Sequence, residues 1–306
     1  MENRTLPEAD LLWNLDELVG ALRTSREITH NVRHRGRIRE LPSRAALCEI
    51  LQGLSAALFP THYGKPDLSD EDIDYFVGNT LNQTLKPLAE QVRRSLFFGT
   101  DADAQDDAVR RKRAIALTRE FASRLVDIRA LLVSDLHAAY RGDPAAASLS
   151  EVMLCYPGFI AVMYHRIAHT LHGLGAPLLG RVIADIAHST TSIDIHPAAQ
   201  IGASFFIDHG TGVVIGETTI IGDNVRLYQA VTLGAKRFPA DENGHLIKGH
   251  QRHPIVEDDV VIYAGATVLG RITIGRGSVI GGNVWLTHSV PPESNVSQAQ
   301  AQSDCD

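Results

Sequence analysis

Aliphatic residues recur at every sixth position between Ile195 and Pro291, and this repeat is the strongest pattern in the chain. The repeated positions are Ile195, Ile201, Ile207 and Val213, then, after a two-residue shift in phase, Ile215, Ile221, Leu227 and Leu233, and after an interruption Val256, Ile262, Val268, Ile274, Ile280 and Leu286. Glycine often follows them, where a small residue lets the backbone turn a corner. Such a short fixed period indicates a parallel β-helix. A β-sandwich would instead show hairpin signals every 8–12 residues or so.

The first part of the chain has apolar residues at helical spacing, so it predicts an all-helical region. The expected helices cover residues 10–25, a stretch from Ser43 to Leu58, a stretch beginning at 69–72 in which Pro87 begins or kinks a successor, one long helix from Ala108 towards Tyr140, and residues 158–172 and 176–188. The first strand is expected near Ile193. The predicted fold class is therefore α+β, with a helical domain over 1–189, a β-helix over 190–292 and a polar tail over 293–306.

Composition indicates the cellular compartment and the classes of partner to expect. The chain has 306 residues, a net charge of -7 and three widely spaced cysteines. The negative charge argues against wholesale nucleic-acid binding, and we interpret the short basic run at 33–39 as a solvated linker. Few cysteines favour a reducing compartment. We see no apolar signal peptide and no run of 18 apolar residues, so we expect a cytoplasmic protein without a membrane partner.

Residues that depart from the repeat form specific motifs. They are Asp-Ile-His-Pro at 194–197, Asp-His-Gly-Thr-Gly at 208–212, Gln-Ala-Val-Thr-Leu-Gly at 229–234 and Arg-His-Pro at 252–254. From about Asp135 to Pro292 the chain resembles the serine O-acetyltransferases. The resemblance implies a left-handed β-helix that forms a homotrimer, with pairing of trimers left open. It also implies acetyl transfer from acetyl-CoA to L-serine, giving O-acetylserine for cysteine biosynthesis, in a reaction that needs no metal.

The expected reaction requires a base, because a serine hydroxyl does not ionise near neutral pH. Histidine suits this task, and the resemblance implies that His209 is the base. Taken alone, a histidine at a strand corner also fits a structural role. Residues about 15–18 apart should stack on neighbouring coils, and Asp194 precedes His209 by 15. The resemblance implies that Asp194 orients the imidazole, and we interpret His196 as a turn residue.

The expected substrate is a zwitterion, so its ammonium needs carboxylates and its carboxylate needs a guanidinium. The resemblance assigns Asp143 and Asp208 to the ammonium and hydroxyl side. It assigns Arg252 and His253 to the carboxylate, with His253 also a candidate donor to the oxyanion. Two neighbouring residues depart from the family pattern: Gly142 replaces a polar or charged residue, and Gln251 replaces an aspartate.

Acetyl-CoA should lie along the outside of the coils, where small residues admit its pantetheine arm. The resemblance places Gly234, Ala264 and Gly282 at these positions. Ala235 replaces a family glycine, and its methyl group narrows the space available to the cofactor. The loop 236–251 is longer than in common relatives, and its basic residues either reach the CoA phosphates or are solvated charges.

Several alternatives remain open. Another hexapeptide acyltransferase would act on a sugar or an antibiotic, and a β-helix carbonic anhydrase would bring three histidines to zinc. A scaffold without activity is the third. His165, His169 and His172 have helical metal-ligand spacing, but no nearby cysteine or carboxylate completes a zinc set, which favours packing.

The polar C-terminal residues predict one difference from relatives. Many serine acetyltransferases end in an isoleucine that inserts into O-acetylserine sulfhydrylase, whereas this sequence ends in Asp306. Burying that charge is unfavourable, so we expect no tight sulfhydrylase complex through the tail.

Overall fold

The computed structural model describes residues 13–29, 40–98 and 106–298. The basic run at 33–39, most of the acidic connector at 100–107 and the last eight residues of the tail lie outside this part. The chain divides into two compact units, residues 1–41 and 42–306. The first unit contains α1 (Leu15–Thr24), within the predicted helix, followed by the π-helical turn η2 (Ser25–Thr29).

The helices of the second unit follow the predicted pattern in most places. They are α2 (Arg44–Leu58), η4 (Pro60–Gly64), α3 (Asp70–Ser95), η5 (Leu96–Phe98), α4 (Asp107–Ser123), α5 (Leu125–Gly142), α6 (Leu149–Cys155), α7 (Pro157–Gly173) and α8 (Pro177–Thr191). Ser43 caps α2 as expected, since the amide of Ala46 donates to its hydroxyl. No described helix combines the length and hydrophobicity needed to cross a membrane.

Two helix predictions were wrong. The single helix expected from Ala108 to Tyr140 is broken at Arg124, whose amide bonds to Phe121, three residues earlier, which tightens the last turn of α4. The expected successor helix at Pro87 does not exist, because Pro87 lies inside α3, which continues to Ser95. Proline removes the hydrogen bond to the carbonyl of Gln83. Because both residues are exposed, water can satisfy that carbonyl.

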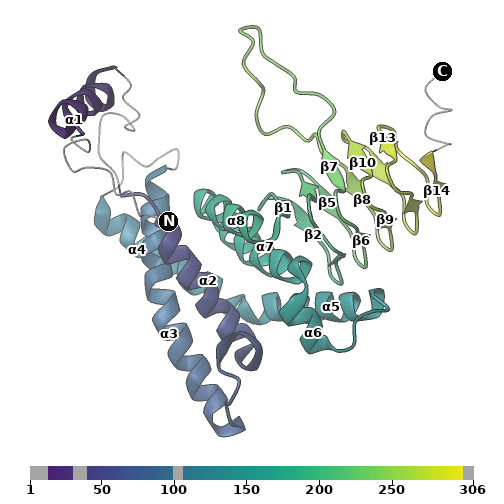
Figure 1. Ribbon diagram of the computed structural model, residues 1–306, viewed down its shortest axis with the longest axis horizontal. Helices are drawn as coiled ribbons and strands as arrows, with labels where there is room; N and C mark the ends of the chain where they lie inside the picture. Colours follow the sequence, from purple (N-terminus) through teal and green to yellow (C-terminus); the bar gives the residue numbers. More distant parts are fainter. Residues whose placement is uncertain (1–12, 30–39, 99–105, 299–306) are drawn as a thin grey trace, which may run out of the picture. The chain divides into compact units, whose positions relative to one another are not determined.

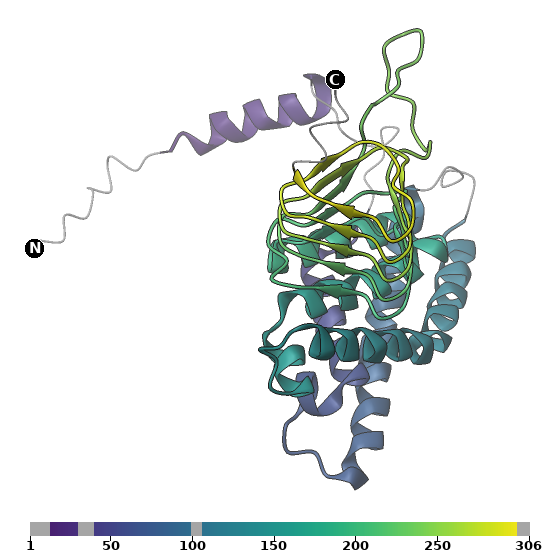
Figure 2. The same ribbon diagram turned by 90° about the vertical axis from the view of Figure 1, so that its right-hand side faces the viewer.

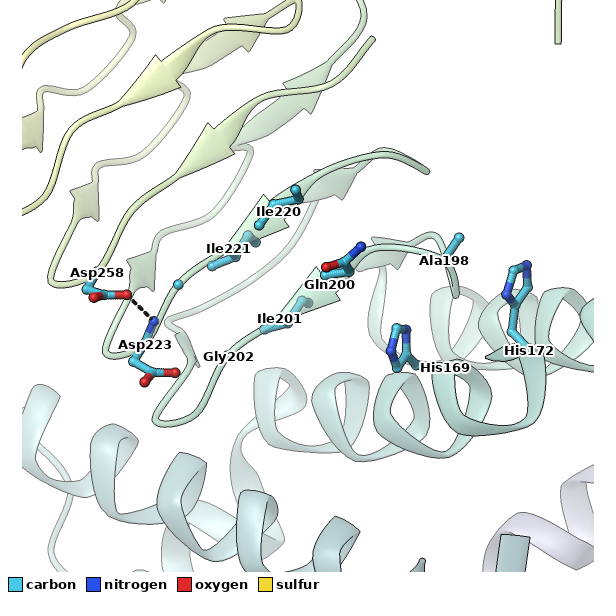
Figure 3. Close-up of a pocket in the computed structure, with 11 residues that line it drawn as sticks. His169, His172, Ala198, Gln200, Ile201, Gly202, Ile220, Ile221, Asp223 and Asp258 are labelled. Atoms are coloured by element: carbon cyan, nitrogen blue, oxygen red, sulfur yellow. Dashed lines mark hydrogen bonds between the residues drawn. The ribbon is translucent and has the colours of Figure 1, made fainter. Parts of the chain in front are cut away.

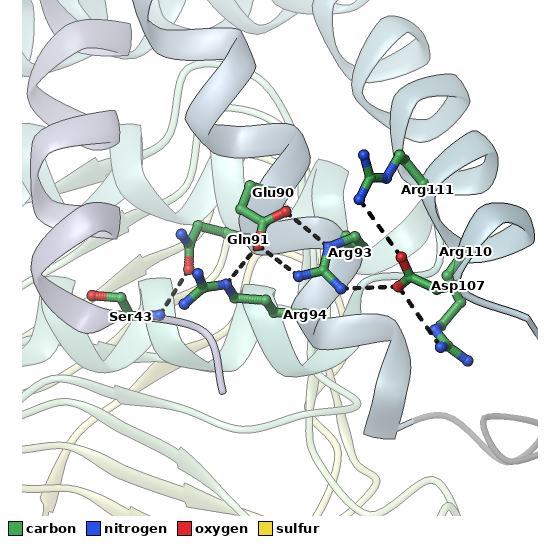
Figure 4. A network of polar contacts seen from close by, with 8 residues as sticks. All are labelled: Ser43, Glu90, Gln91, Arg93, Arg94, Asp107, Arg110 and Arg111. Carbon is green, nitrogen blue, oxygen red and sulfur yellow. Dashed lines mark hydrogen bonds and ion pairs between the residues drawn. The ribbon is translucent and has the colours of Figure 1, made fainter. Parts of the chain in front are cut away.

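Helices α2, α3 and α4 are joined by polar contacts (Figure 4). Glu90 accepts hydrogen bonds from Arg93 and Arg94 on its own helix, and Arg93 reaches across to Asp107 at the start of α4. The hydrogen bond from Arg93 is the main reason that the pKa of Glu90 falls to about 2. These contacts hold α3 and α4 together beside their apolar interface.

After α8 the chain winds into a β-helix of three parallel sheets (Figures 1 and 2). Its strands are β1 (Asp194–Ile195), β2 (Gln200–Ile201), β3 (Phe206–Ile207), β4 (Val214–Ile215), β5 (Ile220–Ile221), β6 (Arg226–Leu227), β7 (Thr232–Gly234), β8 (Ile255–Val256), β9 (Val261–Ile262), β10 (Thr267–Leu269), β11 (Thr273–Ile274), β12 (Val279–Ile280), β13 (Trp285–Leu286) and β14 (Asn295–Val296). Sheet A contains β1, β4, β7, β10 and β13; sheet B contains β2, β5, β8 and β11; sheet C contains β3, β6, β9, β12 and β14. The repeated aliphatic residues point inward, and nearly all of them are buried, as predicted.

Strand register explains the phase shift in the sequence. Val214 pairs with Thr232, 18 residues later, but Asp194 pairs with Val214, 20 residues later. The two extra residues lengthen the connection between β3 and β4, which contains the Asp-His-Gly-Thr-Gly motif. The expected spacing of 15–18 residues was therefore wrong for this first coil. A sequence motif that needs a longer corner has altered the repeat.

A buried ion pair attaches the helices to the first coil. The guanidinium of Arg166 on α7 bonds to the carboxylate of Asp135 on α5, 2.6 Å from its Nε. Arg166 also donates to the carbonyl of Gly202, and Asp135 accepts from the amide of Phe205. Both side chains are at most 5% exposed. Figures 1 and 2 show α5 and α7 lying against the first coils.

Candidate functional site

The sequence-predicted residues gather at two corners of the β-helix. The His209 corner joins β3 to β4 (residues 208–213). The His253 corner leads into β8 (residues 252–254) and includes residues 216–218, one coil earlier, because Ile220 pairs with Ile255. One corner links sheet C to sheet A and the other links sheet A to sheet B. Within one chain, the two groups therefore lie at opposite edges of sheet A.

His209 is held in an unusual backbone conformation. Its φ is 58°, a region that non-glycine residues rarely occupy outside turns and functional sites. The amide of Gly210 donates to the carbonyl of Asp208, closing a tight turn. The imidazole is 68% exposed, and its Nδ1 lies 3.8 Å from Oδ1 of the largely buried Asp208. An exposed imidazole beside a carboxylate can accept a proton from a bound molecule.

Asp194 lies on β1, where its amide donates to the carbonyl of Val213. The side chain of the preceding residue, Ile193, fills the space next to Gly210, so Asp194 is close to the His209 corner along the chain. Among the described residues, its carboxylate has no hydrogen bond or ion pair with His209. The expected pair of Asp194 and His209 stays a prediction.

Asp143 reaches the His209 corner from the end of α5. Its Oδ1 accepts from the amide of Ala145, at 2.8 Å, and its Oδ2 accepts from the hydroxyl of Tyr156. The Tyr156 bond, followed by the Ala145 amide, lowers the pKa of Asp143, and His209 adds to the effect through its charge. Asp143 is thus ionised at neutral pH and faces the same region as His209.

Tyr156 was not found from the sequence. It directly precedes α7, so its contact with Asp143 joins two helices whose packing no short motif records. Gly158 explains how α7 comes so close: a methyl group there would overlap the carbonyl of Ile207 on β3. The small residue lets the start of α7 lie against the corner that contains His209.

The His253 corner is built from opposite charges on successive coils. Arg252 donates to Glu217, at 2.6 Å, and Arg271 donates to the carbonyls of Thr218 and His253. Burial acts to raise the pKa of Glu217, but its bond with Arg252 leaves that pKa below the usual value. The sequence motifs do not include Glu217. A complementary charge one coil away is the signal that could have identified it.

His253 is 6% exposed and neutral at pH 7. Burial, followed by the charge of Arg252, lowers its pKa to about 4. His196, in the motif read as a turn, also has its pKa lowered to about 4, mainly by burial and then by Arg181. Its Nδ1 accepts from the amide of Ala198, which fits the predicted turn role.

The helical histidines do not converge on a common point. His165 is buried, with its ring centroid 5.6 Å from that of His169, whose Nδ1 is bonded to the carbonyl of Pro197. In the described part of the chain, no three His, Cys, Asp or Glu side chains are arranged to hold a metal ion.

The predicted cofactor positions also divide between the two edges of sheet A. Ala264 and Gly282 stack on successive coils between sheets C and A, and the amide of Asn283 donates to the carbonyl of Ala264. Gly234 ends β7 at the opposite edge. The loop 236–251 forms a hairpin with an antiparallel bridge between Ala240 and Leu246, and it projects from the coils (Figure 1).

A basic cavity of about 390 Å³ lies at the base of this hairpin. It is lined by Lys236, Arg237, Pro239, His250, Gln251, Arg252, Leu269, Gly270, Arg271, Ile272 and Thr287. A larger cavity of about 660 Å³ lies between α7 and the outer face of sheet B, beside Gln200, Asp223 and Asp258 (Figure 3). None of the predicted site residues lines that larger cavity, so we place no chemistry there.

Comparison with known proteins identifies the family. Residues 80–163 match the family described as "Serine acetyltransferase, N-terminal", and residues 253–288 match "Bacterial transferase hexapeptide (six repeats)". A protein of Synechococcus elongatus named "Serine acetyltransferase, plasmid" is 58% identical over 298 residues, which are 95% of this chain and 93% of that protein. The serine acetyltransferase of Mycobacterium tuberculosis is 50% identical over 162 residues, covering 53% of this chain and 67% of that protein.

Solved structures agree with the sequence comparison. The crystal structure of Entamoeba histolytica serine acetyltransferase 1 in complex with L-cysteine has a TM-score of 0.69 and 34% identity, covering 93% of this chain and all of that one. Soybean serine acetyltransferase complexed with serine has a TM-score of 0.52 and 30% identity, covering 83% and 96%. By its sequence, its two matched domains and its fold, the chain belongs to the serine acetyltransferase family.

Proposed function

We propose that this protein transfers the acetyl group of acetyl-CoA to the hydroxyl of L-serine, with the two corners beside sheet A acting together. The observation that carries the proposal is that this family member retains the Asp-His-Gly-Thr-Gly segment at one edge of sheet A and Arg-His-Pro at the other. The product, O-acetylserine, supplies cysteine biosynthesis, and we assign the reaction to the cytoplasm.

His209 is the general base in this proposal. Its imidazole removes the proton of the serine hydroxyl, whose oxygen attacks the thioester carbonyl carbon. The carbon–sulfur bond then breaks, and the imidazolium returns its proton to the departing CoA sulfur. Asp194 orients the ring and stabilises its charge. The imidazole is 68% exposed, so both substrates can reach it.

The remaining polar residues bind the serine zwitterion. Asp143 and Asp208 accept from the ammonium and the hydroxyl side, and ionised Asp143 supplies the negative charge this requires. Arg252 and His253 bind the carboxylate at the other corner. Glu217 limits the freedom of Arg252, so the guanidinium is already ordered before serine arrives.

Acetyl-CoA lies against the small residues Gly234, Ala264 and Gly282. The basic cavity below the hairpin fits the CoA phosphates, because Lys236, Arg237 and Arg271 are among the residues that line it. This arrangement favours the phosphate-binding interpretation of the hairpin charges over the solvated one.

Opposite edges of one sheet cannot form one site within a single chain. We therefore propose that the His209 corner of one subunit faces the His253 corner of the next in a homotrimer, where repetition around a threefold axis completes each site.

Two experiments test the proposal. Release of CoA thiol is followed with acetyl-CoA and a panel of amino acids and sugars, and only serine should support rapid turnover. Rapid turnover with a sugar instead would favour the alternative acceptor.

To test the shared site, inactive His209→Ala subunits are mixed with inactive His253→Ala subunits under conditions of verified subunit exchange.

Partial activity is expected in the mixture, since some sites then combine an intact His209 with an intact His253. Mixing His209→Ala with the double variant is the matched control, because no intact site can form. Activity equally absent from both mixtures would contradict the shared site.

A further inference from the structure

Thr218 sits at the centre of the hydrogen bonds around His253. Its hydroxyl oxygen accepts from the backbone amide of Arg252, at 2.9 Å, and from that of His253, at 3.1 Å. A hydroxyl oxygen has two lone pairs and one proton. Both lone pairs are thus occupied, so this hydroxyl can act only as a donor towards any third partner.

The third partner is Nδ1 of His253, 2.9 Å from the Thr218 hydroxyl. The backbone amide of Thr218 also points at Nδ1, at 3.1 Å. An N–H group cannot donate to a nitrogen that already carries a proton. Nδ1 must therefore be the unprotonated, accepting nitrogen of the ring.

We propose that Thr218 is a positioning residue that fixes His253 in the tautomer with its proton on Nε2. His253 then presents a neutral N–H donor to the bound substrate, and it acts neither as a base nor as a cation. This inference rests on the proposed function for the identity of the substrate, but the tautomer itself can be measured without one.

The charges around the ring fit a neutral donor. Arg252 is paired with Glu217, Arg271 donates to the carbonyl of His253, and burial together with Arg252 keeps the ring unprotonated at neutral pH. Gly216 leaves room for the ring of His253, since a methyl group there would overlap the imidazole. A single base is enough for the reaction. A second histidine with a free lone pair facing the substrate would compete with His209 for the serine proton.

Nitrogen NMR of the full-length protein tests the tautomer directly. The protein is labelled with ¹⁵N-histidine, and the His253 ring signals are assigned by their loss in His253→Gln. At pH 7 without substrate we expect a protonated Nε2 and an unprotonated Nδ1. A proton on Nδ1, or a fully protonated ring, overturns the proposal whatever the enzyme acetylates.

Adjacent threonines provide a matched pair of variants. Thr218→Val removes the hydroxyl, whereas Thr219→Val removes a buried hydroxyl that has no partner among the described residues. Thr218→Val should lower kcat/KM for serine about tenfold, the cost of one net hydrogen bond. It should leave the His253 tautomer mixed, because only the backbone amide of residue 218 then still donates to Nδ1. Thr219→Val should keep the wild-type tautomer and activity, and Thr218→Ser should restore both.

The outcomes separate this inference from the proposed function. Equal activity and equal ring signals in Thr218→Val and Thr219→Val would overturn the role of Thr218. If Thr218→Val fails to fold, Thr218→Ser and the wild-type spectrum still decide the tautomer. A wild-type enzyme that does not acetylate serine, with the Nε2–H tautomer present, would contradict only the proposed function.

Discussion

His209 combines an exposed side chain with a constrained backbone, so its chemistry can be removed without disturbing the core. His209→Ala should lower kcat by about 10²–10⁴, the usual contribution of a positioned base. His209→Asn is the matched variant, because asparagine tolerates a positive φ that strains alanine. Steady-state kinetics and circular dichroism check both proteins. More than a tenth of wild-type turnover in either variant would contradict the assignment.

Two neutral histidines make stability depend on pH. The pKa of His196 and of His253 is about 4 in the folded chain, below the ordinary value of 6.5. Between these values the unfolded chain binds protons that the folded chain does not, so the free energy of unfolding falls as pH decreases from 6.5 towards 4. Urea unfolding at a series of pH values should show this slope.

Substituting each histidine tests whether it causes this dependence of the unfolding free energy on pH. His253→Gln and His196→Gln should each reduce it, while the effect of pH above 7 should be the same as in the wild type. Glu90, whose pKa is about 2, contributes only below its usual value of 4.5, so the two effects occur in different pH ranges. An unchanged slope in both glutamine variants would contradict the role of the histidines.

Short motifs revealed the residues that carry the proposed chemistry, but not the residues that orient them. His209 and Arg252 lie in recognisable segments. Tyr156 and Thr218 act through contacts with residues 13 and 35 positions away. Such contacts depend on helix packing and on coil register, and neither can be predicted from a short segment of sequence. The roles assigned to the motif residues stay predictions.

At the scale of elements, one glycine controls how α7 meets the coils. Gly158→Ala should destabilise the protein by about 1–3 kcal/mol, because the added methyl group overlaps the carbonyl of Ile207. It should also lower activity, since α7 begins beside Tyr156. Gly173→Ala is the control on the same helix, because no neighbouring atom lies within 4 Å of its added methyl group. Equal thermal stability of the two variants would contradict this account.

The six-residue period predicted the β-helix because every coil buries the same positions. Helix boundaries were harder to predict. The apolar stripe of residues 108–140 runs across the break at Arg124, since both helices bury their stripes in one core. Helix α6 has only seven residues and too few turns for a periodic signal. The proposed division of the chain at residues 189 and 292 stays a prediction.

For the molecule as a whole, the ion pair of Asp135 and Arg166 attaches the helices to the β-helix. Asp135→Ala leaves a buried guanidinium without its partner and should cost about 3–5 kcal/mol of unfolding free energy. Glu120→Ala breaks the exposed pair with Arg124 and should cost less than about 1 kcal/mol. Urea denaturation measures both, and similar losses would contradict the anchoring role.

The hairpin of this enzyme can change during evolution independently of the coils. Thr232 pairs with Thr267 across it, 35 residues later, in the same parallel register that other coils reach after 18. The chain leaves the β-helix and returns without disturbing a strand. Insertions and deletions at this corner therefore leave the strand pairing of the β-helix unchanged. The hairpin can diversify while the coils that hold His209 and His253 keep their spacing.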